Sequence, residues 1–246
     1  MEDLVRSLVA LGFALLLVML RLEASRFGTA EYDEPGRTDG RSLVHRLSWY
    51  ALGVIGIVAI LKIHPAPGRE LFLTVGDPFG AIVLGMILAL AGAAQSVGMA
   101  LYHYRHLRLP DIAAYPGALA NELMTAFLDE AIFRGALLGF LIFGGFGANL
   151  AILVQAMVYT LATRLGAPGR DRYMFFLSLV VGLATGWATV TTGGIGAAFL
   201  GHAVTRVGVF LSTGHSGQPA PSGTEPEDVE RRRRMPEGWR VVGRDR

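Results

Sequence analysis

Long apolar stretches alternate with polar connectors as far as Ser212. Seven stretches of 17 residues or more consist mainly of Leu, Val, Ile, Ala, Gly and Phe, and they are Leu4–Leu22, Leu47–Ile63, Phe79–Tyr102, Gly117–Phe143, Ala148–Leu165, Tyr173–Val190 and Ile195–Leu211. About 17 to 25 such residues form a helix that crosses a bilayer, inside which every backbone polar group must be bonded internally. We therefore predict an all-α fold, a polytopic transmembrane helix bundle with about seven spans.

Composition agrees with an integral membrane protein and excludes several other classes. Only 17% of the 246 residues are charged and 52% are hydrophobic, whereas a soluble domain carries about 25% charged residues. The chain has no cysteine, which excludes disulfides and thiolate chemistry. Its basic residues lie mainly in connectors and the tail, where they report membrane orientation. We expect membrane lipid as a partner and no nucleic acid.

The connectors differ in charge on the two predicted sides of the membrane. Basic residues concentrate on one side, which holds Arg21, Arg26, Arg37, Arg41, Arg46, Arg105, Arg108, Arg164, Arg170, Arg172 and the tail. The other side holds Arg6, Lys62 and Arg69. Since basic residues accumulate on the cytoplasmic side, we predict an outside N-terminus and a cytoplasmic C-terminus.

Three regions follow from this pattern. Residues 1–113 are predicted to hold three spans, a charged cytoplasmic loop at Glu23–Arg46 and an interfacial segment at Tyr102–Pro110. Residues 114–212 hold the other four spans. Residues 213–246 are rich in Pro, Gly, Ser and charge, so we predict a disordered cytoplasmic tail.

The fourth stretch contains a charged cluster, Asp129, Glu130 and Arg134. Each ionisable group at bilayer depth costs about 2.5–3.5 kcal/mol, so these side chains must face protein or water. Glu130 and Arg134 lie one helical turn apart on one face. The cluster is either an internal ion pair that fixes helix packing or a polar site inside the membrane. Gly135 and Gly139 are expected to allow close helix contact.

Two further stretches carry polar residues at helical spacing. Gln155, Tyr159 and Thr163 recur every fourth residue on the fifth, and His202 and Arg206 stand one turn apart on the seventh. We predict that they meet the charged cluster in one enclosed site. Two carboxylates and two guanidiniums would balance there, and a divalent cation would be repelled in a low dielectric. We therefore predict no metal and no other cofactor.

The order and spacing of these residues resemble the CAAX protease and bacteriocin-processing family (CPBP or Abi) of intramembrane proteases. Its signatures Glu-Glu-x-x-x-Arg, Phe-x-x-x-His and His-x-x-x-Asn fall on Asp129–Arg134, Tyr159–Thr163 and His202–Arg206. The resemblance covers about Ala114–Leu211, which makes the last four spans a CAAX-protease-like core.

The resemblance implies an endopeptidase that cleaves a membrane-associated or lipidated peptide near the cytoplasmic face of a bacterial cell membrane. By position, Asp129 would be the general base, Glu130 the second carboxylate, and His202 and Arg206 the donors to the oxyanion. Thr163 stands where the family has histidine.

The departures from the signatures leave enzymatic activity open. Asp129 reaches about 1 Å less far than glutamate, a misplacement that can cost about 100-fold in rate. The hydroxyl of Thr163 cannot act as a base near neutral pH. One hypothesis is a working but impaired protease, and the alternative is an inactive relative that serves as a membrane scaffold or binds a membrane protein. A transporter or proton pathway is a third class, disfavoured because we find no inverted repeat.

Overall fold

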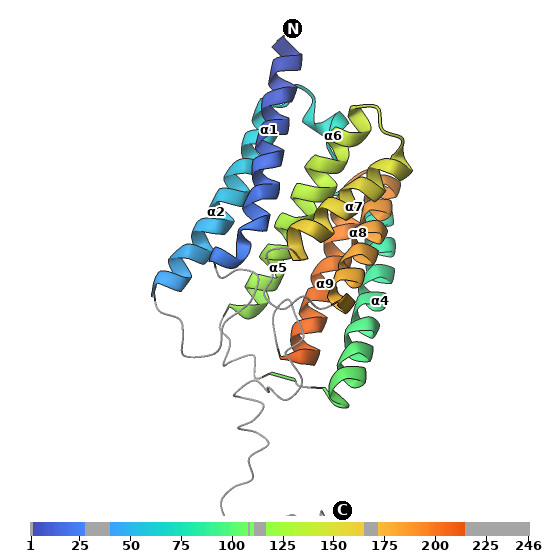
Figure 1. The fold of residues 1–246 in the computed structure, drawn as a ribbon. Coiled ribbons are helices and arrows are strands. Elements are labelled where there is room, and N and C mark those ends of the chain that lie inside the picture. The colour runs from blue at the N-terminus through green and yellow to red at the C-terminus, as the bar shows by residue number, and fades with distance from the viewer. Residues whose placement is uncertain (1, 28–39, 108, 111–116, 165–171, 215–246) are drawn as a thin grey trace, which may run out of the picture.

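The computed structural model describes residues 2–27, 40–107, 109–110, 117–164 and 172–214. Every regular element in these ranges is a helix, so the all-α prediction is confirmed (Figure 1). In chain order the elements are α1 (Glu2–Leu22), the 3₁₀ helix η1 (Ala24–Phe27), α2 (Gly40–Ile63), α3 (Pro67–Glu70), α4 (Pro78–Tyr104), α5 (Ala118–Asp129), the π-helix η3 (Glu130–Leu137), α6 (Leu138–Phe143), α7 (Ala148–Arg164), α8 (Arg172–Thr192) and α9 (Gly196–Thr213).

The seven predicted spans correspond to α1, α2, α4, the continuous run α5–η3–α6, α7, α8 and α9. The largest difference is α2, which begins at Gly40 instead of Leu47, inside the predicted loop. Similarly, α4 continues to Tyr104, so the predicted interfacial segment is helical at its start. Hydropathy marks where a helix leaves the bilayer, and a helix can extend beyond that point. The predicted disordered tail lies outside the described residues from 215 onward.

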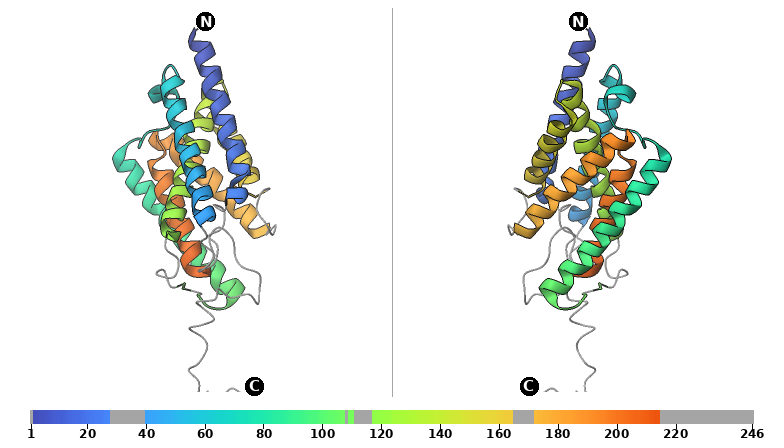
Figure 2. Two further views of the ribbon diagram at one scale, coloured as in Figure 1. Left: turned by 90° about the vertical axis from the view of Figure 1, so that its left-hand side faces the viewer. Right: turned by 90° about the vertical axis from the view of Figure 1, so that its right-hand side faces the viewer.

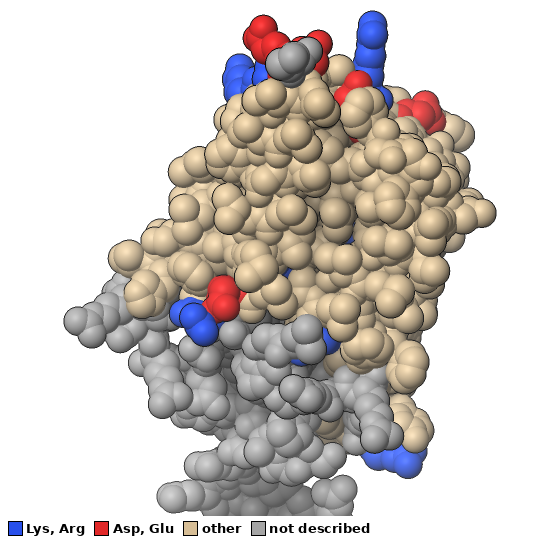
Figure 3. Space-filling view, turned by 45° about the horizontal axis from the view of Figure 1, so that its top comes forward, with Lys and Arg blue, Asp and Glu red and all other residues tan. Residues whose placement is uncertain are grey.

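Four of these helices are long and apolar enough to cross a membrane, namely α1, α2, α4 and α8. Their outward faces carry large apolar side chains such as Leu16, Phe79 and Phe176, which are 64%, 77% and 63% exposed. Between its two ends, the surface in Figure 3 is almost free of charged side chains. Lipid must cover such a surface, so the chain is an integral membrane protein.

The other three predicted spans, α5–η3–α6, α7 and α9, carry the predicted polar residues. Their polar residues face the interior of the bundle, while α7 also has an outward apolar face on which Leu153, Met157 and Leu161 are exposed. Packing pairs α4 with α9, α7 with α8 and α1 with α2 (Figures 1 and 2). The α4–α9 contact crosses the predicted boundary at residue 113, and the division into three regions remains a prediction. We call the end of the bundle where α1 begins the upper end, and the end where it finishes the lower end, as in Figure 1.

An extended segment between α3 and α4 ties together the upper ends of three helices. The Phe72 N–H donates to the Gly135 carbonyl (3.1 Å), and the Asp77 N–H donates to the Thr192 carbonyl (2.7 Å). The Ile195 N–H donates to the Thr74 carbonyl (2.9 Å). These bonds satisfy backbone groups of the extended segment and of the helix ends near the bilayer.

Glycine permits the close approach of this segment to the π-helix and α6. A Cβ on Gly139 would lie 2.6 Å from the Glu70 carbonyl oxygen and 2.9 Å from the Leu71 Cα, and one on Gly135 would lie 2.4 Å from Leu73 Cδ2. The predicted close contact at these glycines therefore exists, and the neighbours are the end of the short helix α3 at Gly139 and the side chain of Leu73 at Gly135.

The Gly139→Ala variant should lose about 1–3 kcal/mol of unfolding free energy, because the added methyl group meets backbone that cannot move aside. Gly12→Ala is the matched control, since no atom lies within 4 Å of the new Cβ on this α1 glycine. Thermal unfolding of the detergent-solubilised chain measures both. Equal stability of Gly139→Ala and wild type would contradict the packing described.

Candidate active site

The charged cluster lies at the centre of the bundle, where α5 continues into the π-helix. Asp129 ends α5, and Glu130 and Arg134 lie in η3, where the Leu138 N–H bonds to the Phe133 carbonyl five residues earlier. All three charged side chains are 0% exposed. Short π-helical segments occur often at functional sites because they change the direction of side chains along a helix.

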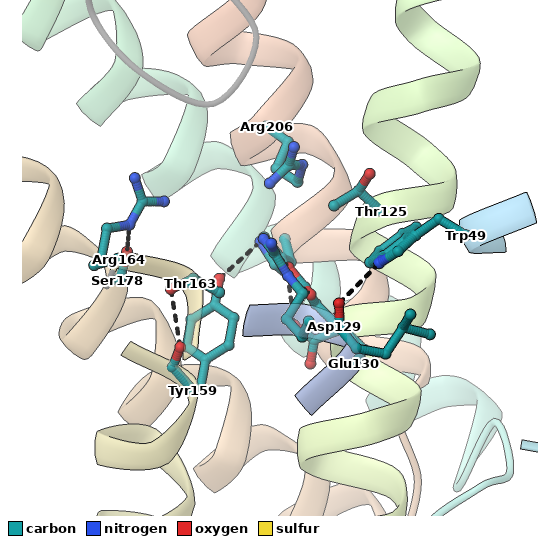
Figure 4. A network of polar contacts seen from close by, with 12 residues as sticks. Trp49, Thr125, Asp129, Glu130, Tyr159, Thr163, Arg164, Ser178 and Arg206 are labelled. Atoms are coloured by element: carbon teal, nitrogen blue, oxygen red, sulfur yellow. Dashed lines mark hydrogen bonds and ion pairs between the residues drawn. The ribbon is translucent and has the colours of Figure 1, made fainter. Parts of the chain in front are cut away.

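A chain of side-chain contacts joins η3, α9 and α7 (Figure 4). Glu130 Oε1 lies 2.6 Å from His202 Nδ1, and the hydroxyl of Tyr159 lies 3.2 Å from His202 Nε2. With Glu130 ionised the carboxylate accepts, which assigns the imidazole proton to Nδ1 and makes Nε2 the acceptor for the Tyr159 hydroxyl. The structure thus brings together the three spans that the sequence analysis expected to meet.

Arg134 lies between the carboxylate and the aromatic ring. Its Nη1 is 3.2 Å from Glu130 Oε1, and its guanidinium carbon lies 4.1 Å from the centre of the Tyr159 ring. The predicted pairing of Glu130 with Arg134 is therefore present. The cation over the ring adds a second favourable interaction in a desolvated setting.

Asp129 has a partner that the sequence analysis did not identify. Arg21 of α1 approaches both carboxylate oxygens, with Nε 2.5 Å from Oδ1 and Nη2 3.3 Å from Oδ2. Arg21 is only 4% exposed. Its place at the end of an apolar stretch predicts a surface charge, and that prediction is wrong for Arg21.

Arg206 also faces an acidic partner that we had not selected. Its Nε lies 2.9 Å from Oε2 of Glu122, which is 1% exposed. Glu122 precedes Asp129 by seven residues, two helical turns, and that spacing was the available signal. At and around the charged cluster, three buried carboxylates are thus paired with three guanidiniums, whereas the sequence predicts two of each. The pairs are Glu122–Arg206, Asp129–Arg21 and Glu130–Arg134.

Thr163 and Gln155, which were predicted to face the charged cluster, form their hydrogen bonds elsewhere. The Thr163 hydroxyl donates to the Tyr159 carbonyl one turn earlier (2.9 Å), as hydroxyls in helices often do. Gln155 donates to the Gly182 carbonyl of α8 (2.8 Å). The expected stripe of three therefore faces the cluster only through Tyr159.

A small cavity of about 40 Å³ lies beside His202, toward the lower end of the bundle. Its polar wall includes Glu122, Tyr159, His202 and Arg206, and its apolar wall includes Leu177 of α8. This volume has room for about two or three water molecules. His202 lines this cavity, whereas Asp129 and Glu130 do not. A molecule in the cavity would therefore meet the imidazole and not these two carboxylates.

Residues 111–207 match the family model described as Type II CAAX prenyl endopeptidase Rce1-like. The resemblance to the CAAX protease family is confirmed. Searches of curated proteins and of solved structures find no match to the chain. The matched CAAX-protease-like segment contains all seven residues predicted from the signatures, while Arg21 lies outside it.

The donors needed for a metal do not gather in the CAAX-protease-like site. Among the residues that the structure describes, no three His, Asp or Glu side chains lie close enough to bind one ion. Independence from metal remains a prediction.

Tyr159→Phe places the family's phenylalanine at this position and removes the hydroxyl that bonds His202. We expect a loss of about 1 kcal/mol in unfolding free energy, the usual worth of one hydrogen bond, with the ring still beneath Arg134. Tyr159→Leu, which also removes the ring, should lose at least 1 kcal/mol more. Chemical unfolding in detergent measures the series, and a Phe variant as unstable as the Leu variant would contradict it.

Proposed function

We propose that the protein is a membrane endopeptidase of CAAX-protease type in which His202 is the general base. The observation that carries this proposal is the 2.6 Å contact between Glu130 and His202 Nδ1, because it leaves Nε2 as an acceptor beside the cavity. A carboxylate that orients an imidazole in this way makes it an effective base near neutral pH.

These positions support a hydrolytic mechanism. The 3.2 Å contact between Tyr159 and Nε2 is long for a hydroxyl, and it leaves that lone pair accessible to a water that enters the cavity. Nε2 takes one proton from the water as its oxygen bonds to the peptide carbonyl carbon. The guanidinium of Arg206 stabilises the resulting oxyanion. The imidazolium then gives its proton to the leaving nitrogen as the C–N bond breaks.

The proposed substrate is a membrane-associated or lipidated peptide that enters from the lower end, which we assign to the cytoplasm of a bacterial cell. Arg164, the last residue of α7, lines the cavity there. The α8 wall offers apolar contacts to a peptide side chain through Met174, Leu177 and Val181. The assignment of this side rests on the distribution of basic residues, which places the N-terminus outside.

A catalytically inactive scaffold or binding protein is the second candidate. It is favoured by the engagement of Asp129, which stands at the family's general-base position, with Arg21 through both oxygens. The hydroxyl of Thr163, at the position of the second signature's histidine, is bonded within α7. In this candidate the paired charges hold the bundle together, and the protein binds its partner without cleaving it.

Cleavage of a lipidated peptide by the reconstituted protein decides between the two candidates. Glu130→Gln and His202→Gln should each lower kcat by about 100- to 10,000-fold, the usual contribution of general-base catalysis. His64→Gln is the matched control, because this histidine is also buried but lies at the upper end, beside Glu70.

If the wild type is inactive and Thr163→His is active, the site is a vestigial active site. This result would support the second candidate, an inactive scaffold or binding protein. Full activity of the purified His202→Gln variant would remove the imidazole from the mechanism.

We also propose that the site needs no metal, because the buried guanidiniums beside it would repel a divalent cation. Peptidase activity should therefore persist in the presence of a strong chelator, and equilibrium dialysis should detect no stoichiometric zinc. Zinc binding that disappears in both His202→Gln and Asp129→Asn would contradict this proposal.

A further inference from the structure

Arg21 reaches the site from a helix outside the family-matched segment. On α1 the buried residues are Ala10, Ala14, Leu17 and Arg21, a single stripe at helical spacing that faces the bundle. An arginine at the end of a span usually extends toward the membrane surface, where its charge is hydrated. Arg21 instead points inward and remains 4% exposed, so an interaction in the interior must compensate for the lost hydration.

Two contacts with α2 hold the lower end of α1, from which Arg21 extends. The indole N–H of Trp49 in α2 donates to the carbonyl of Leu20, the preceding residue (3.0 Å). Leu17 packs closely over Gly56, where a Cβ would lie 2.6 Å from the leucine Cδ2. The lower end of α1 is therefore fixed against α2, and the guanidinium reaches Asp129 in a forked arrangement that fits a carboxylate.

The charge of Asp129 acts on the proposed base. Asp129 directly precedes Glu130, whose Oε1 lies 2.6 Å from His202 Nδ1, so the charge of Asp129 is close to the imidazole. Arg134 of η3 and Arg206 of α9 are the other charged groups near this carboxylate. A carboxylate that is 0% exposed and loses its counter-ion is strongly disfavoured as an anion. Without Arg21, Asp129 would therefore take up a proton and become neutral.

We propose that Arg21 is a positioning residue of the active site, which keeps Asp129 ionised so that its charge stabilises the imidazolium formed at His202. The catalytic part of this inference rests on the proposed function. The control of the Asp129 charge by Arg21 does not depend on it. Whether or not the protein is a peptidase, α1 contributes Arg21 to a site whose other residues lie in the CAAX-protease-like segment.

Infrared difference spectroscopy of the full chain in lipid tests the charge state directly. At neutral pH, wild type minus Asp129→Asn should show no carbonyl stretch of a protonated carboxylic acid. Arg21→Gln should show this band, and Arg21→Gln/Asp129→Asn should lack it. Arg6→Gln is the matched control, because Arg6 lies on the same helix and donates to the Ile63 carbonyl at the upper end. An ionised Asp129 in Arg21→Gln would overturn the proposal.

The uncharged double variant Arg21→Gln/Asp129→Asn distinguishes an effect on folding from an effect on the charge of Asp129. Its two amides replace the ion pair at similar size. If Arg21→Gln does not fold while Arg21→Gln/Asp129→Asn does, an unpaired Asp129 is the cause, which supports the pairing. If the double variant is no more stable than Arg21→Gln, the two side chains are not coupled and the proposal fails.

The peptidase assay tests the catalytic part. Arg21→Gln should lower kcat at least tenfold with KM within about twofold, because the lost charge acts on the transition state. Arg21→Lys keeps a cation and should recover part of kcat. Unchanged or higher kcat in Arg21→Gln would show that Arg21 only anchors or blocks the site. If wild type cleaves nothing, the proposed function fails, and the infrared result alone decides the charge claim.

Discussion

Charge in a lipid-covered interior has to be matched by opposite charge, and this requirement organises the centre of the bundle. Glu122, Asp129 and Glu130 are each at most 1% exposed, far from the solvent that would normally hydrate a carboxylate. Each has an arginine within ion-pair distance, supplied by α1, η3 or α9. Breaking one buried pair costs about 3–5 kcal/mol, so these contacts strongly constrain how the four helices pack.

The same requirement separates the roles of the two adjacent carboxylates. Asp129 is engaged by Arg21 through both oxygens, whereas Glu130 shares one oxygen between Arg134 and His202. Only Glu130 is therefore placed to orient the imidazole. The family signature by itself assigns the base to the Asp129 position, but the geometry favours His202 with Glu130 behind it. The threonine at position 163 then matters less, since the proposed mechanism does not use the second signature's histidine.

Periodicity was sufficient to predict the helices and the contact of Glu130, Tyr159 and His202, but Gln155 and Thr163 do not join that contact. The apolar stretches correspond to the seven predicted spans. The four-residue spacing of Glu130 with Arg134 and of His202 with Arg206 predicts helix faces that point into the bundle. Pairing partners were not predictable in the same way. Arg21 at the end of a span has the same local sequence whether it extends to the surface or turns inward, and only the position of α1 against η3 decides. The π-helical register of η3 likewise depends on tertiary packing.

The protonation state of His202 is the most direct test of the account. Solid-state nitrogen NMR of histidine-labelled protein in bilayers, with His202→Gln subtracted to isolate one ring, distinguishes the two imidazole nitrogens. We predict a neutral ring with the proton on Nδ1, and a change in its spectrum in Glu130→Gln. A ring protonated on Nε2, or one that is unaffected by Glu130→Gln, would contradict it.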